Sequence, residues 1–119
     1  MIIEVKKDPR YKVSIKGIRQ IAERILHDFN QQENTLLSVV FVGKRKAKQL
    51  NEGYRKMDYI PEVLSFPSAE TVTPEGNKFL GDVMICFPLA RERAIIENQL
   101  LEKSIEELLR HGINNLIAN

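Results

Sequence analysis

One stretch of the chain, residues 50–67, does most to constrain the fold. It begins as the end of a polar helix, turns at residues 58–61, and continues as a short apolar strand over residues 63–66. Strand side chains point alternately to opposite faces, so Leu64 can face a core while Ser65 faces the other way. We therefore place this strand at the centre of the fold.

Arg55 lies just ahead of that strand. Its guanidinium is permanently charged and carries a fork of N–H donors that suits phosphate oxygens. A rigid strand with a cation beside it is a suitable floor for a site that handles a phosphodiester. The alternative is that Arg55 forms a surface or structural ion pair, for example with Asp58 or Glu62.

Positive charge is concentrated in the first half of the chain. The net charge is +2, but residues 1–58 hold 13 Lys and Arg against 7 Asp and Glu, whereas residues 59–119 hold 5 against 9. Such an uneven distribution can supply a phosphate-binding surface. The candidate substrate-binding residues, which we expect close to Arg55, are Lys44, Arg45, Lys46 and Lys48. The alternative is a solvated helix face without a binding role.

The composition is that of a soluble globular protein, with 43% hydrophobic and 29% charged residues among 119. We expect one domain over residues 1–119. No apolar run approaches the roughly 20 residues that span a bilayer, and the N-terminus has no signal-peptide pattern, so we expect a cytoplasmic protein. The single cysteine, Cys86, excludes an internal disulfide and is expected to be a small apolar strand residue.

The hydrophobic pattern predicts an α+β fold, with one layer of mixed sheet of about four strands packed with about four helices. Residues 36–42 are apolar and β-branched, which indicates a buried central strand. Gly81 lacks a side chain and would let another backbone or a ligand approach closely. The other predicted strands cover residues 1–5 and 79–87. The predicted helices run from Ser14 to about 30, 44 to about 53, Pro88 to about 98 and 101 to about 117. Residues 68–78 are expected to form a loop or a loose hairpin connection.

Several short motifs together resemble the YbeY family of bacterial ribosomal-RNA endoribonucleases. They occur in the family's order, at similar spacings, from about residue 36 onward. The motifs are Leu50-Asn51, Tyr54-Arg55, Asp58, Val63-Leu64-Ser65-Phe66-Pro67, Gly81-Asp82-Val83 and His111-Gly112.

The resemblance implies a single-strand-specific, metal-dependent endoribonuclease that acts in small-subunit ribosomal-RNA maturation and ribosome quality control. It also implies zinc, held by two histidines four residues apart on a C-terminal helix and a third beyond it. His111 matches the first of these metal ligands, but Asn115 occupies the second position and Ala118 a glycine position. The third position falls beyond Asn119. Glu107 could share the helix face of His111, and a hydrogen-bonded structural role for His111 is the alternative.

Under this hypothesis Arg55 is the catalytic residue that stabilises charge on the phosphate, and Ser65 forms part of the floor. We expect Arg55 and His111 to converge on one cleft across the strand. Ribosomal RNA and ribosomal proteins would be the partners, without membrane or DNA.

Three alternatives to the enzyme stay open. A catalytically impaired RNA- or ribosome-binding protein of the same fold is the first, and a shortened or frame-altered version of an active protein is the second. A metalloprotease ranks last, because Gly112 follows His111 where a catalytic glutamate would be needed.

Overall fold

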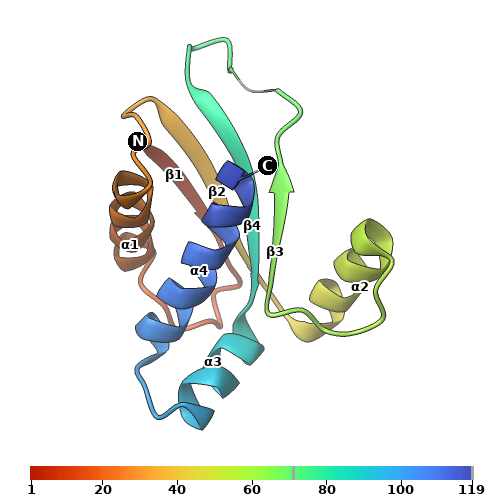
Figure 1. Cartoon of the computed structure of the whole chain (residues 1–119). Helices are drawn as coiled ribbons and strands as arrows, with labels where there is room; N and C mark the ends of the chain where they lie inside the picture. Colours follow the sequence, from red (N-terminus) through yellow and green to blue (C-terminus); the bar gives the residue numbers. More distant parts are fainter. Residues whose placement is uncertain (71, 119) are drawn as a thin grey trace.

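The computed structural model describes residues 1–70 and 72–118, so Thr71 in the predicted loop and Asn119 at the end of the chain lie outside the described residues. Within them, four strands form one mixed sheet, and four helices pack around it (Figure 1). The elements in chain order are β1 (Ile2–Lys6), α1 (Ile15–Asp28), β2 (Thr35–Val42), α2 (Lys44–Arg55), β3 (Val63–Pro67), β4 (Lys78–Cys86), α3 (Phe87–Ile96) and α4 (Leu101–Ala118). The predicted fold class is confirmed.

The strand order is β1-β2-β4-β3, with β1, β2 and β4 parallel and β3 antiparallel to β4. The prediction that residues 36–42 form a central strand is confirmed. The prediction that residues 63–66 form the centre of the fold is wrong, because β3 is an edge strand. Pro67 ends β3 and has no N–H to donate to a ladder, a feature that sheets tolerate at their edges.

Helices cover both faces of the sheet. The larger core joins α1 and α4 to one face, through residues such as Ile25, Ile113 and Val83, which are fully buried. The smaller core joins α2 to the other face and contains Ala47, Leu64, Met84 and Cys86. The β3 side chains therefore alternate as predicted between two covered faces, with Leu64 toward α2.

Local signals in the sequence place the helix ends. The Ser14 hydroxyl accepts a hydrogen bond from the Gly17 N–H at 3.0 Å and caps α1. Pro88 lies in the first turn of α3, as predicted, although β4 ends at Cys86 and Phe87 already belongs to the helix. Cys86 is fully buried. In the part of the chain that the structure describes, no helix combines the length and apolar character required to cross a bilayer.

Gly81 allows the backbone of β3 to approach β4 closely. Its φ is +137°, a conformation that L side chains rarely adopt. A Cβ atom here would clash with the carbonyl oxygen of Phe66 and lie 3.0 Å from the Cα of Pro67. The predicted close approach of another backbone is confirmed.

Gly112 allows α4 to lie directly on β3. The Ser65 hydroxyl donates a hydrogen bond of 2.7 Å to the Gly112 carbonyl oxygen. A Cβ atom on Gly112 would lie 2.5 Å from Val83 Cγ1 and 3.2 Å from Val63 Cγ2. Helix and edge strand are therefore in contact at a point where only glycine fits.

We predict that Gly112→Ala destabilises the protein by about 1–3 kcal/mol, because the added methyl group overpacks this contact. Gly53→Ala is the matched control, since Gly53 is also helical but a Cβ there would meet no described residue within 4 Å. That control should raise stability by about 0.5–1 kcal/mol. Urea unfolding measures both variants, and equal stabilisation by the two would contradict the predicted close contact.

Candidate functional site

A cleft of about 400 Å³ lies at the edge strand β3. Because no further strand pairs with β3 among the described residues, α2 on one face of the sheet and α4 on the other both reach the cleft. Its lining residues are Tyr54, Arg55, Val63, Leu64, Ser65, Pro67, His111, Asn115 and Ala118.

Arg55 is the last residue of α2, which ends because Lys56 adopts the left-handed conformation with φ +59°. The Arg55 Nη1 donates a hydrogen bond of 3.2 Å to the Tyr59 hydroxyl. Throughout residues 1–70 and 72–118, Arg55 has no ion-pair partner. Its charge is therefore available to an anion.

The two acids that we considered as partners of Arg55 pair with other bases. Asp58 Oδ1 lies 3.5 Å from Lys48 Nζ, and Glu62 Oε2 lies 3.2 Å from Arg93 Nη1. The alternative interpretation of Arg55 as a structural ion pair is therefore wrong for both acids.

Asn51 fixes the turn that carries Tyr59, and sequence reasoning gave it no role. Its side chain is fully buried, and its Nδ2 donates a hydrogen bond of 3.0 Å to the Tyr59 carbonyl oxygen. The Met57 N–H donates to the Asn51 carbonyl oxygen at 3.3 Å. Through Tyr59, Asn51 positions the acceptor that orients Arg55. The signal in the sequence is a polar residue one helical turn before Arg55.

His111 lies on α4 and lines the same cleft as Arg55. Both residues also line an adjoining cleft of about 580 Å³, together with Glu62, Arg93 and Glu107. The structure thus brings together the guanidinium and the imidazole that the sequence analysis placed in one cleft. Ser65 lines the cleft too, but its hydroxyl hydrogen is already donated to Gly112.

The residues around His111 do not fit a zinc ion. Asn115 and Ala118 supply a carboxamide and a methyl group to the cleft, and neither replaces imidazole at zinc. Glu107 Oε1 accepts a hydrogen bond of 2.6 Å from Gln99 Nε2 and lies 3.9 Å from Arg93 Nε. Among the described residues, His111 belongs to no group of three metal-ligating side chains.

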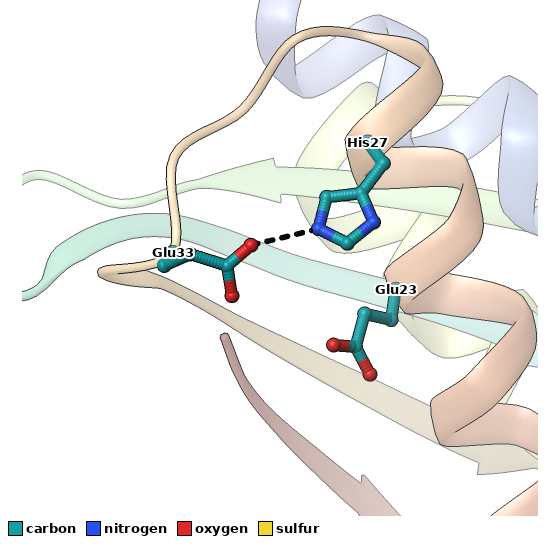
Figure 2. Close-up of side chains that lie close together, drawn as sticks. All are labelled: Glu23, His27 and Glu33. Atoms are coloured by element: carbon teal, nitrogen blue, oxygen red, sulfur yellow. Dashed lines mark hydrogen bonds and ion pairs between the residues drawn. The ribbon is translucent and has the colours of Figure 1, made fainter.

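A different group, Glu23, His27 and Glu33, has ligand atoms within 4.8 Å of one another. Figure 2 shows Glu23 and His27 on α1, with Glu33 on the loop that follows. His27 Nε2 lies 2.8 Å from Glu33 Oε1. The hydrogen bond from His27 lowers the pKa of Glu33. These exposed side chains could hold a divalent cation, but α1 packs against β1, at the opposite edge of the sheet from β3.

The basic residues of α2 are spread along the helix. Lys44 Nζ lies 3.3 Å from Glu92 Oε1, so its charge is already paired, as is that of Lys48. Arg45 and Lys46 are exposed and line a separate cleft of about 400 Å³ beside Tyr11. Because α2 has 12 residues, Lys44 at its start lies about 16 Å from Arg55 along the axis. The expectation that the whole group lies close to Arg55 is therefore wrong for its first turn.

The fold and the cleft define a small α+β protein in which a guanidinium and an imidazole meet at the edge strand of a mixed sheet. A family model described as endoribonuclease YbeY matches residues 3–117. The chain belongs to the YbeY endoribonuclease family.

Curated relatives named endoribonuclease YbeY support this membership. The protein from Phytoplasma australiense is 41% identical over 86 residues, which are 71% of this chain and 60% of the relative. The protein from Sulfurihydrogenibium is 32% identical over 109 residues, which are 90% and 69% of the two chains. For the Thermodesulfovibrio yellowstonii protein, 38% identical over 83 residues, the covered shares are 70% of this chain and 52% of the relative. The chain spans about half to two thirds of the length of these relatives.

A solved solution structure from Thermotoga maritima has the same fold. It matches with a TM-score of 0.64 at 23% identity, over 97% of this chain and 71% of that one.

We predict that Asn51→Ala lowers the free energy of unfolding by about 1–3 kcal/mol, because the buried amide and its bond to Tyr59 are lost. Asn114→Ala, an exposed asparagine on α4, is the control and should change stability by less than about 0.5 kcal/mol. Urea unfolding is the measurement. Indistinguishable midpoints for the two variants would show that Asn51 does not hold the turn.

Proposed function

We propose that this chain acts on single-stranded RNA of the small ribosomal subunit as an endoribonuclease, with the cleft at β3 as its active site. The observation that carries the proposal is that Arg55 and His111 line one cleft while the Arg55 charge has no ion-pair partner among the described residues. Membership of an endoribonuclease family supports it.

Arg55 would bind the phosphate that reacts. With one N–H engaged by the uncharged phenol of Tyr59, the guanidinium keeps further donors for two phosphate oxygens. Negative charge grows on these oxygens in the transition state, so a fixed cation stabilises the transition state more than the ground state. His111, across the cleft, would hold or move a proton at an oxygen of the same phosphate.

Tyr54 gives a reason for a preference for single strands. Its side chain is 56% exposed, lines the cleft beside Arg55, and is held edge-on against Phe66 with ring centroids 4.6 Å apart. An unpaired base can stack on such a ring, whereas a base inside a duplex cannot. Arg45 and Lys46, at the opposite end of α2 from Arg55, would bind other phosphates of the same extended RNA strand.

A second candidate function is favoured by the donor set around His111. Asn115 and Ala118 do not provide zinc ligands, so the chain would bind ribosomal RNA or a ribosomal protein without cleaving RNA. A zinc ion would acidify a bound water if the site were complete. Zinc in this chain stays a prediction that metal analysis of the purified protein tests.

The test uses a fluorescent single-stranded RNA oligonucleotide from the small-subunit RNA, with DNA of the same sequence as a comparison. We expect RNA cleavage, and we expect Arg55→Ala to lower its rate about 10²- to 10³-fold, because the charge that stabilises the transition state is lost. Lys103→Ala, an exposed cation at the start of α4, is the control and should keep the wild-type rate.

Salt-dependent RNA binding without products would favour the second candidate. An RNA cleavage rate in Arg55→Ala that equals the rate in Lys103→Ala would contradict the proposed site. Stoichiometric zinc together with chelator-sensitive cleavage would establish metal dependence.

A further inference from the structure

Arg93 joins three carboxylates from different parts of the fold. It lies on α3, its side chain is 29% exposed, and its Nη1 donates to Glu62 Oε2 at 3.2 Å. Glu97 lies 4.0 Å from Arg93 Nη2, and Glu107 of α4 lies 3.9 Å from Arg93 Nε. Burial acts to lower the pKa of Arg93, but the hydrogen bond and charge of Glu62, with the charges of Glu97 and Glu107, outweigh it and raise the pKa.

Two of these carboxylates share the larger cleft with Arg55. Glu62, Glu107, Arg93, Arg55 and His111 all line it. Two guanidinium groups thus face two carboxylates in one cleft, and the formal charges cancel when His111 is neutral. Without Arg93 the cleft would carry a net charge of about −1, and Glu62 would lose its ion-pair partner in a cleft that Arg55 also lines.

We propose that Arg93 is a positioning residue that acts through Glu62: it holds this carboxylate away from Arg55 and so keeps the Arg55 guanidinium available for an anion. The identity of that anion as RNA phosphate rests on the proposed function. The Arg93 Nε is buried and has no hydrogen-bond partner within residues 1–70 and 72–118. It lies 3.9 Å from Glu107 Oε1 and restrains this second carboxylate by charge.

Two simpler roles for Arg93 make different predictions. If Arg93 only ties α3 to the start of β3, its loss would change stability and not the environment of Arg55. If Arg93 itself binds the anion, removal of Glu62 as well would not restore binding. A rescue experiment therefore separates the three roles.

The first arm measures the affinity for the single-stranded RNA oligonucleotide. We expect Arg93→Gln to weaken binding about fivefold or more, because freed Glu62 competes with phosphate for Arg55. The double variant Glu62→Gln/Arg93→Gln should bind within about twofold of wild type. Arg91→Gln removes one charge from the same helix outside this cleft and is the matched control for net charge.

The second arm needs no RNA. In ¹⁵N–¹H spectra, the Arg55 Nε–H signal is identified as the one that Arg55→Lys removes. We expect this signal to shift in Arg93→Gln, to return to its wild-type position in Glu62→Gln/Arg93→Gln, and to stay unchanged in Arg91→Gln. Unfolding midpoints of all variants show that each is folded under the conditions used.

The outcomes separate the two proposals. Failure of the wild-type chain to bind RNA overturns the proposed function, whereas the Arg55 signal still tests the role of Arg93. The role of Arg93 in holding Glu62 away from Arg55 is overturned by either of two results. One is an Arg55 Nε–H signal that does not shift in Arg93→Gln, and the other is RNA binding that stays weak in Glu62→Gln/Arg93→Gln.

Discussion

The candidate site depends on the contact between α4 and the edge strand β3. Gly112 has no side chain, so the helix backbone comes close enough for Ser65 to donate its 2.7 Å hydrogen bond to the Gly112 carbonyl oxygen. The neighbouring residue, His111, is thereby placed at the cleft along the edge strand β3. A bulkier residue at position 112 would push the helix away and separate the imidazole from Arg55, because packed side chains leave no spare volume.

The edge position of β3 lets opposite faces of the sheet contribute to one site. Arg55 arrives from α2 on one face, and His111 arrives from α4 on the other. The ion pairs around the cleft keep carboxylates away from Arg55. Lys48 pairs with Asp58 and Arg93 pairs with Glu62, whereas Arg55 is oriented by the Tyr59 hydroxyl. An anion-binding site needs this separation, because a guanidinium already paired with a carboxylate has little attraction left for phosphate.

Sequence patterns predicted what depends on neighbouring residues. Ser14 as a helix cap, the buried strand at residues 36–42 and the close approach at Gly81 follow from local chemistry, and the motif order indicated the family. Strand order and charge pairing depend on contacts between distant segments. The edge position of β3 and the partner of Glu62 on α3 were therefore missed.

The candidate active site requires that Arg55 and His111 contact the same anion. Titration with a short single-stranded RNA, followed by NMR at the Arg55 Nε–H and the His111 ring protons, tests this directly. If they do, both signals will shift together and give the same dissociation constant, and the His111 signals will no longer shift in Arg55→Ala. Response of only one group, or two different dissociation constants, would contradict a shared cleft.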